Sequence, residues 1–157
     1  MNFKNVAKII ATWGGAGYLP WAPGTWGTLA ALPFGIFAML IFSYSWFLIS
    51  ILVIFILGVW SSYILLADSV EDDPGYIVVD EAVGVWIALI PTNMDYRYWI
   101  LAFVLFRLFD IAKPWPIGWL DQNIKGTRLV NAFGVMIDDV LAGIFTAICI
   151  FFLSIFM

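Results

Sequence analysis

Five acidic side chains lie within or beside apolar runs of the chain. They form two neighbouring pairs and one single residue: Asp80 with Glu81, Asp138 with Asp139, and Asp110. Carboxylates in a poorly hydrated site repel one another and lose hydration, so they cannot all ionise without a counter-charge. Mg²⁺ prefers oxygen ligands and shares its coordination readily with a substrate phosphate. The five acids therefore predict a Mg²⁺ site.

One apolar run ends in a cluster of charge, proline and tryptophan that could meet the anion. Its charged residues are Arg107, Asp110, Lys113 and Asp121. Pro114 stops the helix and restricts the backbone beside Lys113, which holds that ammonium group at the headgroup boundary. A point charge so placed suits a phosphate oxygen. The alternative is a membrane-interface anchor, in which the tryptophans and Arg107 lie at headgroup depth.

Residues 14–28 are rich in glycine and proline, which predicts a loop that opens onto a helix N-terminus. Such loops bind phosphate through unpaired N–H groups and the helix dipole. The candidate contacts here are Gly24, Thr25 and Thr28. The alternative is that Gly24 and Gly27 only permit close helix packing, since no Gly-Lys-Ser/Thr sequence follows.

The composition requires that these residues be positioned inside a membrane. Of the 157 residues, 64% are hydrophobic and 11% are charged, and the mean hydropathy is +1.00. A soluble core of this size could not bury so much apolar surface, so we predict one all-α membrane domain over residues 1–157. The net charge of −4 excludes nucleic-acid binding, and the lack of histidine excludes any imidazole chemistry. Cys149, in an apolar run, is expected to be a small hydrophobic residue.

About five membrane helices are expected. The apolar runs are Thr28–Phe42, Trp46–Ala67, Tyr76–Ile90, Tyr98–Ile111 and Phe133–Phe156. The third is short for a crossing at 1.5 Å per residue, unless it is tilted or the bilayer is thinned. A short amphipathic segment precedes these runs. The acidic loop that contains Asp72 and Asp73 is expected to be solvated. Residues 113–132 are expected to form a polar connection.

The basic residues predict the orientation. With five crossings, one side of the membrane holds Lys4, Lys8, Lys113, Lys125 and Arg128, and the other holds Arg97. The positive-inside rule makes the first side cytoplasmic, an agreement that is lost if the third run does not cross. All five acids then lie at one cytoplasmic depth. This favours a metal site over a stepwise ion path, and over a helix-dipole explanation for Asp138 and Asp139.

Four blocks of the sequence carry a resemblance to a known family. They are Gly17–Thr28 with Ala-Pro-Gly-Thr, Asp80-Glu81 followed by Gly84, Phe106–Pro116, and Met136–Gly143. Together they resemble phosphatidylglycerophosphatase A, which removes the terminal phosphate from phosphatidylglycerophosphate to give phosphatidylglycerol. The resemblance implies Mg²⁺ dependence and a phospholipid substrate in the cytoplasmic leaflet of the bacterial cytoplasmic membrane.

The leading hypothesis is Mg²⁺-assisted hydrolysis of a lipid phosphate monoester. The expected metal ligands are Asp80, Glu81, Asp110, Asp138 and Asp139. The expected catalytic residues are Asp80, Glu81, Asp138, Asp139 and Lys113. The expected substrate-binding residues are Gly24, Thr25, Thr28, Arg107, Lys113, Lys125 and Arg128. Water or an aspartate as nucleophile, the number of metal ions, acyl-chain preference and oligomeric state stay open. The rival hypotheses are a small ion carrier and a non-enzymatic membrane protein with a structural cation.

Overall fold

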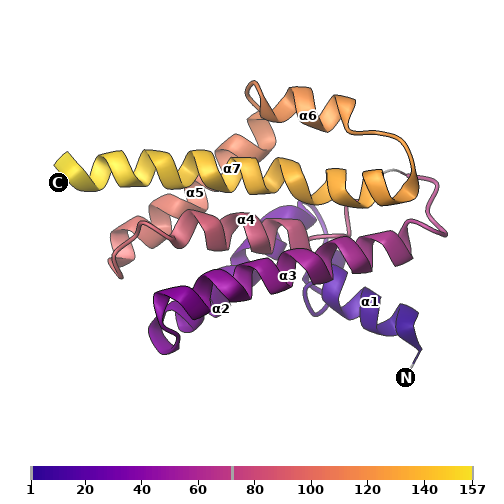
Figure 1. The fold of residues 1–157 in the computed structure, drawn as a ribbon, viewed down its shortest axis with the longest axis horizontal. Coiled ribbons are helices and arrows are strands. Elements are labelled where there is room, and N and C mark those ends of the chain that lie inside the picture. Colours follow the sequence, from indigo (N-terminus) through magenta and orange to yellow (C-terminus); the bar gives the residue numbers. More distant parts are fainter. Residues whose placement is uncertain (1, 72, 157) are drawn as a thin grey trace.

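The computed structural model describes residues 2–71 and 73–156, and every regular element in this part of the chain is helical. The elements follow one another as α1 (Phe3–Ala11), the 3₁₀ turn η1 (Ala16–Tyr18), α2 (Pro23–Ile41), α3 (Tyr44–Leu65), α4 (Val79–Leu89), α5 (Tyr96–Ala112), α6 (Ile117–Asn123) and α7 (Arg128–Phe156) (Figure 1). The all-α prediction is confirmed.

Three helices are long and apolar enough to cross a membrane within the described residues. They are α2, α3 and α7, with 19, 22 and 29 residues. Only 28% of the residues in each apolar window are buried in the protein, so most of these side chains face outward, as lipid contact requires. The expected five crossings are not confirmed. Helix α4 has 11 residues, which span about 16 Å against a hydrocarbon thickness of about 30 Å.

Helix α4 lies in the interior of the bundle, packed mainly against α7 and α2 (Figure 1). Every residue of α4 except Ile87 is buried. Gly84 and Gly143 let α4 and α7 meet backbone to backbone, since a Cβ added at Gly143 would lie 3.0 Å from the Cα of Gly84. On the opposite side, Trp86 Nε1 donates to the carbonyl of Ala31 in α2 at 3.0 Å. The N-terminus of α4, with its two acids, is thereby held inside the protein.

Two helix starts differ from the predicted ones. Helix α2 begins at Pro23, five residues before Thr28, so the Ala-Pro-Gly-Thr sequence forms an N-cap and a first turn rather than a loop. Proline suits this position because its φ is helical and its missing N–H is not needed. Helix α7 begins at Arg128, so Asp138 and Asp139 lie about three turns inside it instead of one. The predicted polar connection also contains α6.

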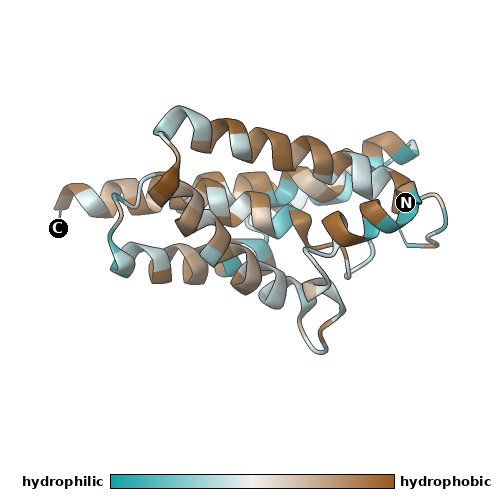
Figure 2. Ribbon diagram, turned by 90° about the horizontal axis from the view of Figure 1, so that it is seen from below, coloured by the Kyte–Doolittle hydropathy of each residue, from teal (hydrophilic) through white to brown (hydrophobic). Residues whose placement is uncertain are grey.

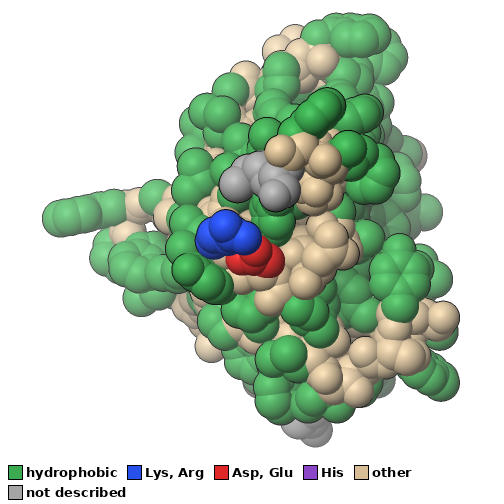
Figure 3. Space-filling view, turned by 90° about the vertical axis from the view of Figure 1, so that its left-hand side faces the viewer, with side chains coloured by type: hydrophobic (Ala, Val, Ile, Leu, Met, Phe, Trp, Pro, Cys, Tyr) green, Lys and Arg blue, Asp and Glu red, His purple; other side chains and the backbone are tan. Residues whose placement is uncertain are grey.

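Polar groups are distributed unevenly over the molecule. Figure 2 shows long hydrophobic stretches along the helices and hydrophilic residues in the interior of the bundle. The end at the left of Figure 1 is mostly hydrophobic when seen face on (Figure 3). The ion pair of Asp95 with Arg97, at 2.6 Å, lies at the start of α5. Helix α1 near the N-terminus is amphipathic as predicted, with Ala7 and Ala11 buried and Lys4 exposed.

Candidate active site

One cavity of about 250 Å³ lies where four helices and a loop meet. Its walls are the first turn of α2, the loop of residues 73–77, the first turn of α4, the end of α5 and the inward face of α7. Its charged lining consists of Asp73, Asp80, Glu81, Arg107, Asp110, Lys113, Asp138 and Asp139. The five acids expected at one depth thus line a single cavity, together with two cations.

Three of these acids are arranged as a cation site would be. Asp80, Glu81 and Asp139 are buried, and each offers a carboxylate oxygen within 4.8 Å of those of the other two. Glu81 Oε2 is buried without a hydrogen-bond partner among the described residues. A buried oxygen left without a partner is costly, and a cation would satisfy it. These residues therefore fit a divalent cation such as Mg²⁺, whereas Asp110 and Asp138 lie outside the three-residue group.

Arg107 places a largely buried positive charge beside this group. Its Nη1 pairs with Asp110 Oδ2 at 2.5 Å, one helical turn along α5, and lies 3.7 Å from Glu81 Oε1. It also donates to the hydroxyl of Thr28 at 3.5 Å. Asp110 is therefore the direct ion-pair partner of Arg107, and the guanidinium group offsets part of the negative charge of the cavity.

Lys113 links three helices at the opposite side of the cavity. Its ammonium group donates to Asp138 Oδ2 in α7 at 2.6 Å and to Asp121 Oδ1 in α6 at 2.8 Å. Burial alone would lower the pKa of Lys113, but Asp138 and Asp121 outweigh burial and raise the pKa above its usual value. The group therefore stays charged. Sequence reasoning placed Lys113 near Asp110 and assigned no role to Asp121, although Asp121 belongs to the same charged stretch.

Asp138 contacts Lys113 through only one of its two carboxylate oxygens. Lys113 occupies Oδ2, whereas Oδ1 is buried and has no hydrogen-bond partner within the described chain. The side chain is almost fully buried and lines the cavity. An oriented carboxylate with a free oxygen in such a place can accept a hydrogen bond or a proton from a reactant.

The first turn of α2 approaches the acids closely. A Cβ added at Gly24 would clash with Glu81 Oε1 and lie 3.1 Å from both terminal nitrogens of Arg107, so a larger residue here would displace these two side chains. Gly24 lines the cavity at a helix N-terminus, where backbone N–H groups can bind an anion. Thr28 is buried behind this wall and donates to the carbonyl of Gly24 at 2.8 Å. Thr25 does not line the cavity.

The acidic loop before α4, which was expected to be solvated, contributes one residue to the cavity wall. Asp73 lines the cavity, although part of its side chain is exposed. Desolvation at this wall, and next the carboxylate of Asp138, raise the pKa of Asp73 to about 6. Asp73 is exposed, as predicted for this loop, and it also forms part of the cavity wall. Asp72 lies outside the described residues.

The two remaining predicted cations lie away from the cavity. Lys125 lines a neighbouring pocket of about 440 Å³. Arg128 lies against α3, where its guanidinium donates to the hydroxyl of Tyr63 at 3.2 Å and sits 4.4 Å from the centre of that ring. A substrate-capturing role for Lys125 and Arg128 stays a prediction.

Apolar outward-facing helices around an internal cavity of carboxylates and cations define a membrane protein with a buried acidic group that could hold a metal ion. Residues 9–154 match the family model PgpA, described as phosphatidylglycerophosphatase A. The chain therefore belongs to the phosphatidylglycerophosphatase A family, as the sequence resemblance predicted, and it is a phosphatase that hydrolyses phosphoric monoesters.

Two curated relatives support this membership. Phosphatidylglycerophosphatase A of Escherichia coli is 36% identical over 98% of this chain and 87% of its own length. The protein of the same name from Haemophilus influenzae is 40% identical over 100% of this chain and 94% of its own length. No solved structure matches the chain. The ion-carrier and non-enzymatic hypotheses are not favoured.

Proposed function

We propose that the protein hydrolyses the terminal phosphate of phosphatidylglycerophosphate, giving phosphatidylglycerol, and that Asp80, Glu81 and Asp139 hold a Mg²⁺ ion. The observation that carries this proposal is the group of three buried carboxylates beside Arg107, Lys113 and the first turn of α2. A cation and a phosphate fit together in this cavity because the acids hold the cation and the basic groups meet the phosphate.

A bound Mg²⁺ ion would supply Lewis-acid polarisation of a phosphoryl oxygen. The chain's own groups perform the remaining tasks. Arg107 and the Gly24 N–H bind phosphoryl oxygens as charge develops on them, which is where most catalysis of phosphoryl transfer arises. Lys113 orients Asp138 through its bond to Oδ2, and Asp138 Oδ1 accepts a proton from the attacking water.

Phosphate release tests this proposal. Purified protein with short-chain phosphatidylglycerophosphate and Mg²⁺ should release inorganic phosphate, and EDTA should reduce the rate at least about 100-fold, because charge stabilisation by the cation is lost. Added Mg²⁺ should restore the rate. Failure to release phosphate in the presence of Mg²⁺ would refute the substrate assignment. Activity that resists prolonged EDTA treatment would instead refute the metal assignment alone.

We further propose a multi-pass arrangement in the bacterial cytoplasmic membrane, with the cavity open to the cytoplasmic face. The charge asymmetry supports it, because Lys113 lines the cavity and Lys125 lines the neighbouring pocket, whereas Arg97 lies at the start of α5. Cysteines at Gln122 and Met94, in a Cys149→Ala background, should be labelled from opposite sides in intact cells and inverted vesicles. Labelling from the same side would contradict this arrangement.

A further inference from the structure

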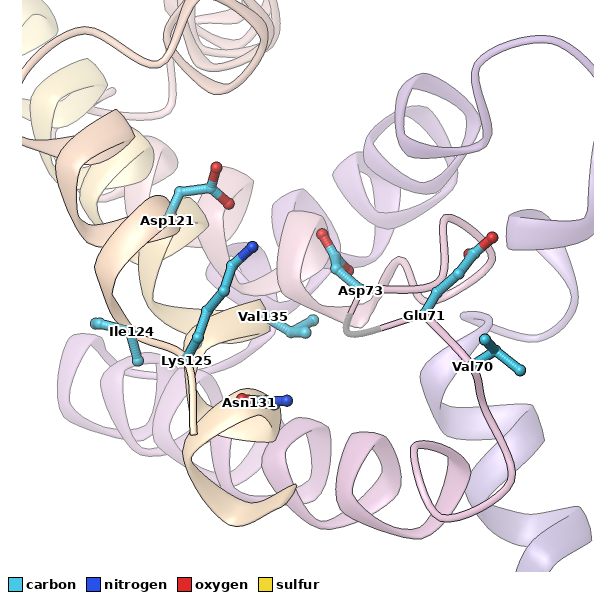
Figure 4. Close-up of a pocket in the computed structure, with 9 residues that line it drawn as sticks. Val70, Glu71, Asp73, Asp121, Ile124, Lys125, Asn131 and Val135 are labelled. Atoms are coloured by element: carbon cyan, nitrogen blue, oxygen red, sulfur yellow. The ribbon is translucent and has the colours of Figure 1, made fainter. Parts of the chain in front are cut away.

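A second pocket, of about 440 Å³, adjoins the cavity (Figure 4). Glu71 and Asp73 come from the loop before α4, and Asp121 and Lys125 face them from α6 and the connection that follows it. The described chain encloses more space here than in the cavity with the three carboxylates. The function proposed above leaves this space unassigned.

The pocket and the cavity share a wall. Asp73 lines both of them. Lys113, which lines the cavity, also donates at 2.8 Å to Asp121, which lines the pocket. A ligand whose phosphate occupies the cavity can therefore extend past Lys113 into the pocket without crossing the core of the bundle.

The charged side chains that line the pocket determine which chemical groups of a ligand can bind there. Carboxylate oxygens accept hydrogen bonds from hydroxyl groups, and the pocket offers those of Asp73, which also lines the cavity, and of Asp121, which is bonded to Lys113. A second phosphate would be repelled by these two acids, but it could pair with Lys125, whose ammonium group points into the space between Asp121 and Asp73 (Figure 4). This pattern fits a hydroxylated group followed by a single negative charge.

We propose that this pocket is the subsite for the polyol headgroup of the lipid, an inference that rests on the proposed phosphatase function. Asp121 accepts the one hydrogen bond that the free hydroxyl group of the polyol can donate, next to the terminal phosphate. Lys125 pairs with the phosphodiester that joins this polyol to the diacylglycerol. The pocket, rather than the carboxylate cavity, thereby distinguishes one phosphomonoester lipid from another.

Substrate analogues test the hydroxyl contact directly. We compare short-chain phosphatidylglycerophosphate with an analogue in which propane-1,3-diol replaces the central glycerol and so removes its hydroxyl group. The wild-type protein should show kcat/KM about 10-fold higher for the natural headgroup, because a hydrogen bond to a carboxylate is lost in the analogue. In Asp121→Ala this ratio should approach one. Asp121→Ala also removes a hydrogen-bond partner of Lys113, but this loss affects kcat/KM for both lipids equally and does not change their ratio.

A second variant tests the contact with the phosphodiester. Lys125→Met should raise KM about 10-fold for both lipids and leave kcat nearly unchanged, because both carry the phosphodiester. The matched control Lys8→Met removes an exposed cation of α1 that lines neither space, and KM should change less than about 2-fold. Equal KM changes in Lys125→Met and Lys8→Met would overturn the phosphodiester contact.

The outcomes separate this inference from the proposed function. A wild-type protein that releases phosphate from both lipids with equal kcat/KM, or an Asp121→Ala variant that keeps the wild-type ratio, overturns the headgroup subsite and leaves the phosphatase function standing. Release of phosphate from neither lipid overturns both.

Discussion

Glu81→Gln should lower kcat about 10²- to 10³-fold while the protein stays folded and inserted. The amide keeps the size of the side chain but removes the charge that a hard cation requires, and the group shared with Asp80 and Asp139 loses one of its three ligands. The Mg²⁺ concentration needed for half-maximal activity should rise as well. Steady-state phosphate release across a Mg²⁺ titration measures both effects.

The same variant should be more stable than wild type when no metal is present. In EDTA, three buried carboxylates repel one another, and replacing Glu81 removes one of these charges. The unfolding temperature in detergent with EDTA should therefore rise, although activity falls. Asp95→Asn is the control, because Asp95 pairs with Arg97 far from the cavity, and kcat should change less than about 2-fold. Full activity of Glu81→Gln with an unchanged Mg²⁺ requirement would contradict the metal assignment.

Lys113→Met should lower kcat about 100-fold and change KM little. The substitution removes the charge that pairs with Asp138 at 2.6 Å and the link that Lys113 forms between α6 and α7, so the carboxylate that we propose as proton acceptor loses its orientation. Lys113→Arg, which keeps the charge, should recover part of the rate. Initial-rate kinetics on mixed micelles separate kcat from KM.

Arg128→Met provides the matched comparison, because this cation lies against Tyr63 and outside both the cavity and the pocket. It should mainly raise KM, by weakening attraction of an anionic lipid. If Lys113→Met kept its kcat and Arg128→Met abolished activity, the start of α7 would bind the phosphate. The role of Lys113 would then be refuted.

The convergence of the acids could be predicted from the sequence because charge in an apolar helix demands partners. Two acidic pairs in apolar runs, each with a glycine four residues after one of its members, already placed Gly84 and Gly143 near the site. The structure adds that these two glycines touch and bring α4 against α7.

Ion-pair partners could not be predicted, because they depend on how separate helices pack. Asp110 is close to Lys113 in sequence, yet Lys113 ends α5 in a left-handed conformation and reaches Asp138 and Asp121 instead. The start of α7 was missed because Arg128 and its polar neighbours resemble a connection in composition, although they continue the helix. The buried position of α4 depends on long-range packing that no local pattern records.

The backbone contact between Gly84 and Gly143 bears on which cation the protein accepts. Two of the three carboxylates belong to α4 and one belongs to α7. No side chain separates these helices where Gly84 meets Gly143. The close contact of the two backbones therefore limits how far the three carboxylates can move apart to fit a larger ion. A fixed set of oxygens discriminates by ionic radius, because Mg²⁺ demands bonds of about 2.1 Å whereas Ca²⁺ needs a wider and more yielding shell. We infer that Ca²⁺ enters this site poorly and cannot replace Mg²⁺ in the phosphate-release assay; full activity with Ca²⁺ would show that the crossing yields to the larger ion.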